Sequence, residues 1–247
     1  MKNKIYDKKF YENRDRETTP SAMEILKIVT DAFQVKTAVD FGCGVGTWLK
    51  CFKNLVDQNT SVLGLDGDYV PRDYMIISDA EFMPTNLNEE VKLNSRYDLA
   101  ISLEVAEHLK PERSATFIKD ICDAADVVLF SAATKYQGGD GHINEQRLSY
   151  WVELFKQQGY GMIDVVRPQI WNNTNIPVWY RENIVVFYNL KSETISKAAT
   201  EAMIKYDEKL VDVIHPDLFE KRSKIVLNPA FRLLHKIKTA VMAPKNK

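Results

Sequence analysis

Cysteine and long apolar segments are both scarce in this sequence of 247 residues. The three cysteines, Cys43, Cys51 and Cys122, form no Cys-x-x-Cys pair, which disfavours a zinc site built from sulfur and favours reduced thiols. No run of eighteen apolar residues occurs, and the first residues lack the apolar stretch of a secretory signal. We therefore expect a cytoplasmic protein with no transmembrane segment.

Acidic residues are missing from the end of the chain. Residues 221–247 contain eight Lys or Arg and no Asp or Glu. Since the whole chain has a formal net charge of −1, residues 1–220 carry about −9. An acidic body of this kind disfavours nucleic acid as a partner. Residues 229–242 predict an amphipathic helix, which either packs against the acidic body or a dimer mate, or makes peripheral contact with an anionic membrane or a partner.

Short apolar runs alternate with helix-length segments along the middle of the chain. This alternation predicts a parallel sheet covered by helices on both faces, as in an α/β domain. With 45% hydrophobic and 27% charged residues, the composition suits one compact domain of this kind. The expected strands are the first residues of 38–47, then 62–66, 97–103, 127–133, 160–167 and 183–189, with a helix at 144–158.

Glycine occupies every second position of the turn after the first expected strand, at Gly42, Gly44 and Gly46. Glycine lets a ligand approach the backbone closely, and the first amides of the following helix add hydrogen-bond donors. The spacing differs from the Gly-x-Gly-x-x-Gly of dinucleotide folds, because Thr47 stands where the third glycine would fall. Asp66 ends the next apolar run about twenty residues later, where a carboxylate can accept both hydroxyls of a ribose. The pattern predicts a nucleoside cofactor other than NAD, and a plain strand-to-helix connection is the alternative.

These features resemble the class I S-adenosylmethionine-dependent methyltransferases over roughly residues 20–190. The matching motifs are Asp-Phe-Gly-Cys-Gly-Val-Gly at 40–46, Gly-Leu-Asp at 64–66 and Asp-Leu-Ala-Ile-Ser-Leu-Glu-Val-Ala-Glu-His-Leu at 98–109. The resemblance implies a Rossmann-like seven-stranded sheet that binds S-adenosylmethionine at its edge. The cofactor-binding residues that it implies are Asp40, Gly42, Cys43, Gly44, Gly46, Trp48, Asp66, Gly67, Asn86, Leu87, Ser102 and Leu103.

The resemblance assigns a part of the cofactor to several of these positions. The glycine turn lies beside the methionine moiety, Asp66 binds the ribose, and Ser102-Leu103 forms the backbone edge near the sulfonium. The family usually binds the adenine amino group with an acid after the third strand, and this chain offers Asn86 or Asp79. We favour Asn86, because twenty residues after Asp66 leave room for a helix and a returning strand. An amide at this position departs from the usual carboxylate.

Two carboxylates and an imidazole follow the strand expected at 97–103, as Glu104, Glu107 and His108. If a helix begins here, the three residues share one face at the carboxyl edge of the sheet. Oxygen-rich sites with one or two imidazoles suit Mg²⁺, Mn²⁺ or iron(II). A glycine-rich loop follows the next strand, and we choose its His142 as the fourth metal ligand.

The Glu-x-x-Glu-His pattern with a later histidine resembles the metal-dependent small-RNA 2′-O-methyltransferases, and the pattern alone resembles the ubiquinone-pathway O-methyltransferases. In those families the metal holds the acceptor oxygens beside the methyl group. The alternative is a site without metal, in which His108 bonds a backbone group and Glu107 is solvated. His142 is then the expected general base, with His108 as its substitute, because an imidazole titrates near neutral pH.

A polar loop rich in aromatic residues is expected between the last two strands, at 168–183. Aromatic faces with amide groups suit a sugar ring, and arginines bind phosphate or carboxylate. The opposing interpretation is an aromatic plug that closes the edge of the sheet. The predicted substrate residues are Arg167, Trp171, Trp179, Tyr180 and Arg181.

The order of motifs from Phe130 to Asn183 also resembles a bacterial methyltransferase group associated with surface-polysaccharide genes. This resemblance predicts an O-methyltransferase that acts on a small sugar- or phosphate-containing precursor of a surface glycan, with help from Mn²⁺ or Mg²⁺. Two alternatives remain open, which are methylation of an RNA 2′-hydroxyl and a non-catalytic scaffold protein that binds S-adenosylmethionine.

Three segments are expected along the chain: an N-terminal lid, an S-adenosylmethionine-binding domain and a basic helical extension, at 1–20, 21–190 and 191–247. Tyr6, Phe10 and Tyr11 give the lid aromatic side chains, and the extension starts with a helix at 192–213. The protein is expected to be a monomer or a homodimer.

Overall fold

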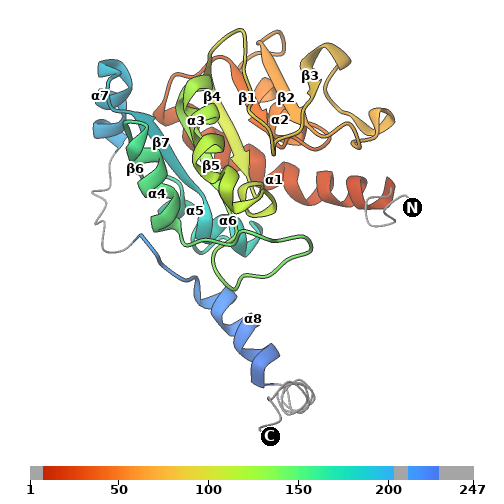
Figure 1. Ribbon diagram of the computed structural model, residues 1–247, viewed down its shortest axis with the longest axis vertical. Helices are drawn as coiled ribbons and strands as arrows, with labels where there is room; N and C mark the ends of the chain where they lie inside the picture. The colour runs from red at the N-terminus through yellow and green to blue at the C-terminus, as the bar shows by residue number, and fades with distance from the viewer. Residues whose placement is uncertain (1–7, 203–210, 228–247) are drawn as a thin grey trace, which may run out of the picture. The chain divides into compact units, whose positions relative to one another are not determined.

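The computed structural model describes residues 8–202 and 211–227 (Figure 1). The chain divides into two compact units, residues 1–212 and residues 213–247, and the first unit carries the sheet. The described part of the second unit contains the helix α8 (Pro216–Leu227). No helix within the described ranges is long and apolar enough to cross a membrane.

A seven-stranded sheet organises the first unit, with the strand order β3-β2-β1-β4-β5-β7-β6. Neighbouring strands run parallel from β3 to β5, whereas β7 runs antiparallel to both β5 and β6. The strands are β1 (Ala38–Phe41), β2 (Val62–Asp66), β3 (Phe82–Pro84), β4 (Tyr97–Leu103), β5 (Ala125–Ser131), β6 (Tyr160–Ile163) and β7 (Val185–Asn189). This order confirms the predicted Rossmann-like α/β fold with seven strands.

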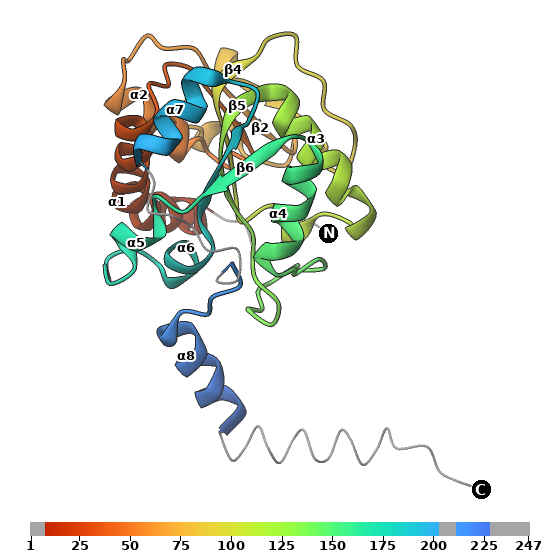
Figure 2. The ribbon, with the colours of Figure 1, turned by 90° about the vertical axis from the view of Figure 1, so that its left-hand side faces the viewer.

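Helices cover both faces of the sheet, because alternate residues of the central strands point to opposite sides. Leu99 and Ile101 of β4 belong to one apolar cluster, while Ala100 between them belongs to the other. The first cluster includes α1, α2 and α6, and the second includes α3 and α4, which lie on the other side of the sheet (Figure 2). The helices of this unit are α1 (Lys8–Ala32), α2 (Thr47–Leu55), α3 (Ser114–Ala124), α4 (Leu148–Gln157), α5 (Arg167–Ile170), α6 (Val178–Asn183) and α7 (Glu193–Ala202).

The connection between β2 and β3 contains two short 3-10 helices, Arg72–Tyr74 and Asp79–Glu81, in place of an α-helix. Gly67 and Pro71 stand at its start, and both residue types interrupt helical hydrogen bonding. The expectation of a helix in this connection is therefore wrong, although β3 returns beside β2 as predicted.

The helix expected at 144–158 begins later than predicted, at Leu148. The backbone amides of Ile143 and Asn144 both donate to the carbonyl oxygen of Glu107, at 2.9 Å each. These two bonds hold the start of the segment away from helical geometry, and they tie the loop after β5 to the loop after β4.

The region between the last two strands is more helical than predicted. Arg167 begins α5 instead of ending the strand before it, and the segment expected as a loop at 168–183 contains most of α5 and all of α6. Pro168 stands in the first turn of α5 and Pro177 directly precedes α6. Proline is tolerated at a helix start, where its missing amide is not needed.

The predicted boundary between residues 20 and 21 falls within a helix, whereas the one between residues 190 and 191 falls in the turn between β7 and α7. α1 runs without a break across residue 20, so the expected lid and domain share one helix, which contains Phe10 and Tyr11. Tyr6 lies outside the described residues, as does the helix expected at 229–242. α7 forms the first part of the helix expected at 192–213, up to Ala202, whereas the described residues 211–213 at its expected end are not helical.

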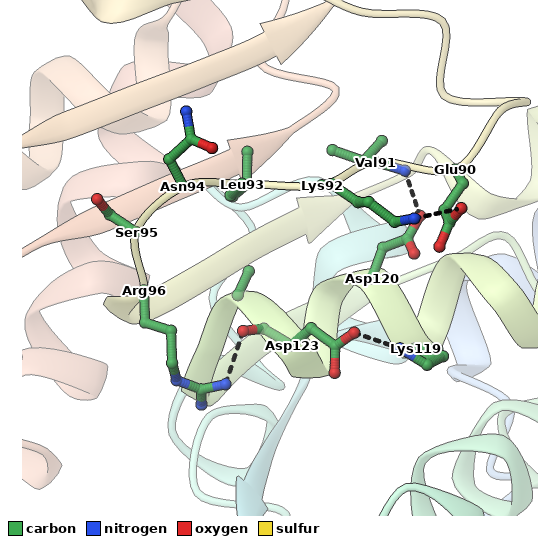
Figure 3. Close-up of a pocket in the computed structure, with 11 residues that line it drawn as sticks. Glu90, Val91, Lys92, Leu93, Asn94, Ser95, Arg96, Lys119, Asp120 and Asp123 are labelled. Atoms are coloured by element: carbon green, nitrogen blue, oxygen red, sulfur yellow. Dashed lines mark hydrogen bonds and ion pairs between the residues drawn. The ribbon is translucent and has the colours of Figure 1, made fainter.

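A buried ion pair fixes α3 to the segment that precedes β4. The guanidinium of Arg113 pairs with Asp120 on α3, and their side chains are 6% and 4% exposed. Oδ2 of Asp120 also accepts the backbone amide of Val91 at 2.8 Å. Further along the same helix, Asp123 forms an exposed ion pair with Lys119 (Figure 3).

A pocket of about 340 Å³ adjoins this ion pair, at the amino ends of β4 and β5 (Figure 3). Its charged side chains already have partners: Lys92 pairs with Glu90 at 3.1 Å, and Arg96 pairs with Asp126 at 2.6 Å. The glycine turn lies at the other edge of the sheet, at the carboxyl end of β1. Because the charges of the pocket are internally paired, the edge with the glycine turn is the stronger candidate for the functional site.

Replacing Asp120 with alanine should lower the free energy of unfolding by about 3–5 kcal/mol, because Arg113 would stay buried without its carboxylate. The matched control is Asp123→Ala on the same helix, which should leave stability nearly unchanged because water screens the exposed pair. Chemical denaturation of both variants measures the difference. Equal losses in the two variants would contradict the assignment of Asp120 as a buried anchor.

Candidate active site

The glycine turn at the end of β1 contains three residues in left-handed conformation, Gly42, Gly44 and Gly46, with φ of 95°, 54° and 92°. A Cβ atom at Gly42 would stand 2.3 Å from Val105, and one at Gly46 would stand 2.7 Å from Ile77. A Cβ atom at Gly44 would meet no atom of the described residues within 4 Å. The turn is therefore tightly packed on two sides, and its middle residue faces open space that a ligand can fill.

The carboxylate of Asp66, at the end of β2, is bonded to the glycine turn. Its Oδ2 accepts the backbone amide of Gly44 at 2.8 Å. Its Oδ1 accepts the amide of Gly67 at 2.6 Å and the hydroxyl of Tyr69 at 2.7 Å. The Tyr69 side chain lies across Gly67 and is 72% exposed.

Two buried polar atoms near the turn have no hydrogen-bond partner among the described residues. They are Oδ2 of Asp40, which is 2% exposed, and Oγ of Ser102, which is completely buried. Burial raises the pKa of Asp40, and the negative charge of Asp66 raises it further. Unsatisfied polar atoms beside an open glycine turn fit a polar ligand such as the cofactor that the resemblance implies.

Three other predicted cofactor positions, Cys43 in the glycine turn, Trp48 on α2 and Leu103 on β4, pack against neighbouring residues. Cys43 is buried with its sulfur against Gly64, and burial raises the pKa of its thiol, so it is not a nucleophile. The ring of Trp48 packs edge-on against Tyr180 at 5.5 Å between centroids. Leu103 ends β4 and packs against the first apolar cluster.

Asn86 follows β3 by two residues and lies at the same edge of the sheet as Asp66, which pairs with Pro84. Its side chain bonds within its own turn, donating to Glu89 at 2.8 Å. Asp79 precedes β3 and is exposed in a 3-10 helix, so it lies toward the opposite end of the strand. The neighbouring Leu87 is 8% exposed and packs in the second apolar cluster.

The prediction of a helix that begins at Glu104 is wrong. Glu104 has a φ of 57°, and a 3-10 helix begins only at Ala106. The amide of Glu104 donates to the carbonyl and the hydroxyl of Ser131, at 3.0 and 3.2 Å, which prolongs the pairing of β4 with β5 by one residue. Glu104 therefore does not share a helical face with Glu107, and its Oε2 instead accepts Nε2 of Gln137 at 3.2 Å.

Three of the four predicted metal ligands do lie together. Ligand atoms of Glu107, His108 and His142 all fall within 4.8 Å of one another. Nε2 of His142 stands 4.0 Å from Oε1 of Glu107, and the two imidazoles meet edge to face with centroids 4.8 Å apart. The loop after β5 thus brings His142 to the residues that follow β4, as the sequence predicts.

Glu107 is the unusual member of this cluster. Its side chain is completely buried, and neither carboxylate oxygen accepts a well-formed hydrogen bond from the described residues, although the amides of Glu107 and Ala133 lie near. Burial raises the pKa of Glu107 well above its usual range, and the negative charge of Glu104 raises it further. Nδ1 of His108 lies 3.2 Å from the carbonyl oxygen of Gly141, a backbone contact that both the metal-bound and the metal-free interpretations allow.

Three further polar residues belong to this site and were not predicted. Asn183 donates to Gln137 at 2.7 Å, and Gln137 in turn donates to Glu104, so a chain of neutral amides ends at a buried carboxyl. Burial raises the pKa of Glu104 against the opposing effect of these hydrogen bonds. Glu145 accepts Nδ1 of His142 at 2.9 Å. Only Glu145 carries a sequence signal, since it follows His142 by three residues in one loop.

The two arginines predicted to bind a substrate anion are used inside the protein. Arg167 is 2% exposed, pairs with Asp164 at 2.8 Å and donates to the carbonyl of Glu182 at 3.2 Å. Arg181 is 6% exposed and donates to the carbonyls of Ile176 and Trp171 at 3.0 Å each. Because both guanidinium groups are buried and bonded to the backbone, their prediction as phosphate ligands is wrong.

Two of the aromatic residues predicted to bind substrate pack in or against the apolar core. Tyr180 is 5% exposed within the first apolar cluster, and the partly buried Trp179 packs against the same cluster. Trp171 lies directly after α5 and is partly exposed. These positions support the alternative interpretation of an aromatic plug at the sheet edge.

Solved structures share this fold. DesVI from Streptomyces venezuelae matches with a TM-score of 0.52 at 13% identity, over 73% of this chain and 95% of that protein. Human N-acetylserotonin methyltransferase, solved with S-adenosylmethionine, matches with a TM-score of 0.50 at 11% identity, over 73% of this chain. The match covers 55% of the human enzyme, so this chain spans about half of its length. No curated protein matches the sequence.

The family comparison covers the region that builds the site. Residues 12–165 match the family described as "Methyltransferase domain". The matched region includes the glycine turn, Asp66 and the residues from Glu104 to His142. The chain therefore belongs to this methyltransferase family and has the class I fold of the S-adenosylmethionine-dependent methyltransferases.

Proposed function

We propose that this protein is an S-adenosylmethionine-dependent O-methyltransferase that acts on a small, sugar-containing precursor of a bacterial surface glycan. We include a divalent metal, Mn²⁺ or Mg²⁺, held by Glu107, His108 and His142. The observation that carries the proposal is the buried carboxyl of Glu107, which lies with the two imidazoles in the cluster at the carboxyl edge of the sheet. Val105, between Glu104 and Ala106, contacts Gly42 directly, so the cofactor turn and the cluster are adjacent.

The donor set supports a hard divalent cation. A carboxylate and two imidazoles suit Mn²⁺ or Mg²⁺ when substrate oxygens and water complete the coordination. A bound cation would also neutralise Glu107, whose charged form is otherwise disfavoured by burial. When bound, S-adenosylmethionine supplies an electrophilic methyl group, and the cation would lower the pKa of an acceptor hydroxyl.

The roles of the protein groups follow from in-line transfer. The acceptor oxygen must be aligned with the methyl group and must lose one proton. Asp66 and the glycine turn orient the donor, while Glu107, His108 and His142 orient the acceptor. If no metal takes part, Nε2 of His142 is the group that accepts the proton, because Nδ1 is already bonded to Glu145.

A sugar acceptor is supported by the neutral polar groups around the cluster. Gln137 and Asn183 bond to each other and to Glu104, so the groups beside this carboxyl are neutral and add no positive charge that would select a phosphate. Because Arg167 and Arg181 donate to backbone carbonyls inside the protein, they no longer give a reason to expect a phosphate.

The buried cysteines carry no disulfide among the described residues, which supports a cytoplasmic location for the proposed enzyme.

Asp66→Ala should weaken binding of S-adenosylhomocysteine, the demethylated product, by about 10–100-fold. Hydrogen bonds from ribose hydroxyls to a charged group contribute about 1.5–3 kcal/mol. Isothermal titration calorimetry measures the change, with Asp68→Ala as the control because the Asp68 side chain is 87% exposed two residues further on. Undiminished affinity in Asp66→Ala would contradict the ribose assignment.

Mn²⁺ at roughly 100 times its Kd should raise the Tm by about 5–10 °C, and Glu107→Gln should abolish this rise. Without metal, Glu107→Gln should have nearly the wild-type Tm at neutral pH, because the raised pKa keeps Glu107 protonated and therefore similar to an amide. Since the cation displaces that proton, the rise should grow as the pH increases from about 6 to about 8.

Differential scanning fluorimetry provides this measurement, with the exposed Glu112→Gln as the control. A rise that persists in Glu107→Gln, or methyl transfer undiminished by a chelator, would exclude the cluster as a metal site.

His142→Ala should bind S-adenosylhomocysteine as the wild type does and should lose methyl transfer by about 10²–10⁴-fold. The assay follows product formation on a panel of nucleotide sugars and short RNAs. Turnover on RNA alone would favour the RNA 2′-O-methyltransferase alternative. Cofactor binding without turnover on either class, unaffected by loss of both His108 and His142, would favour the scaffold alternative. Full turnover in His142→Ala would remove His142 from the site.

A further inference from the structure

The carboxylate of Glu145 organises the loop that carries His142. Its Oε1 accepts the amide of Gly138 at 2.5 Å and Nδ1 of His142 at 2.9 Å, and its Oε2 accepts the amide of Tyr136 at 2.9 Å. A carboxylate oxygen can only accept, so the contact with Nδ1 requires the proton of the neutral ring to be on Nδ1. Nε2, which then carries the lone pair, lies 4.0 Å from Oε1 of Glu107.

The same loop holds a strained residue. Tyr136 has a φ of 71°, a conformation that costs a residue other than glycine about 1–2 kcal/mol, and its side chain is 81% exposed. Its amide is held by the same Glu145 carboxylate that orients the imidazole. A Cβ atom at Gly139 would stand 2.3 Å from the ring of His142, so the loop is wound closely around this side chain.

We propose that Glu145 is a positioning residue of the methyl-transfer site, which fixes the Nδ1–H tautomer of His142 and holds Tyr136 at the rim as an aromatic contact for the acceptor. The proposal deepens the function above and rests on the assigned role of His142. If Glu145 only stabilised the loop, hydrogen bonds from the backbone amides of the loop would be sufficient. In this loop one of the three bonds to Glu145 comes from the imidazole of His142. The other nitrogen of that ring lies 4.0 Å from the buried carboxyl of Glu107, which has no well-formed hydrogen bond.

The tautomer can be measured without knowing the acceptor. The chain has four histidines, so long-range ¹H–¹⁵N spectra of the metal-free protein at about pH 8 give a readable set of ring signals. His142→Ala identifies the signal of His142. We expect the wild type to show the Nδ1–H tautomer of this ring, and an Nε2–H tautomer would overturn the proposal without any further variant.

Variants of Glu145 test whether this carboxylate fixes the tautomer of His142. Glu145→Ala should move the His142 ring toward the Nε2–H tautomer and leave the His108 signal unchanged. Glu145→Gln should preserve the Nδ1–H tautomer, because its carbonyl oxygen can still accept from Nδ1. The matched control is Asp140→Ala, which removes an exposed acid from the same loop and should leave the tautomer unchanged. An unchanged tautomer in a folded Glu145→Ala protein would also overturn the proposal.

Binding measurements separate positioning from a general loss of structure. Glu145→Ala should weaken Mn²⁺ binding by about 10–100-fold and leave the affinity for S-adenosylhomocysteine unchanged. With an acceptor found in the panel, Tyr136→Ala should raise KM and leave kcat nearly unchanged, whereas Glu145→Ala should lower kcat. A Tyr136→Ala enzyme with the wild-type KM would overturn the part of the proposal that concerns the rim.

The catalytic role of His142 and the positioning role of Glu145 can each be wrong without the other. If His142→Ala keeps full turnover, the assigned role of His142 fails, even when the tautomer is as expected. If His142→Ala is inactive but Glu145→Ala keeps the wild-type tautomer and Mn²⁺ affinity, the proposed function stands and the positioning role of Glu145 is wrong.

Discussion

The parallel, in-register pairing of β2, β1, β4 and β5 is the constraint on which the rest of the molecule depends. It brings the carboxyl ends of four strands to one edge of the sheet. The glycine turn follows β1, Asp66 ends β2, Glu104 follows β4, and the loop with His142 follows β5. Backbone hydrogen bonds of the sheet therefore hold together groups that are up to a hundred residues apart in the sequence.

Local signals predicted this edge and failed where a distant contact decides the conformation. Apolar runs and the spacing of the glycines were sufficient for the four parallel strands, the turn and Asp66, because each signal is contained in a few consecutive residues. The helix expected at Glu104 is absent because its amide is bonded to Ser131, 27 residues away, and the residue adopts a positive φ. No pattern within residues 104–108 carries that information.

Burial explains why the sequence misassigned the two arginines as substrate ligands. An arginine that binds a phosphate and an arginine that donates to backbone carbonyls have the same residue type and similar neighbours in the sequence. Arg167 and Arg181 are of the second kind, and only their three-dimensional partners distinguish the two. The amide chain from Asn183 through Gln137 was also missed, because its members lie 46 residues apart and no local pattern connects them.

The two carboxyls at the active-site edge show how stability and chemistry are connected in this fold. Glu104 receives a hydrogen bond from Gln137, whereas Glu107 is completely buried without a well-formed bond to either oxygen. A buried carboxyl without partners destabilises a fold unless it is protonated or faces a cation. Glu107 lies beside two imidazoles and close to the glycine turn, where the cation that we propose would relieve this destabilisation. The carboxyl for which neither oxygen has a well-formed hydrogen bond among the described residues is therefore also the group that would gain most from the proposed cation.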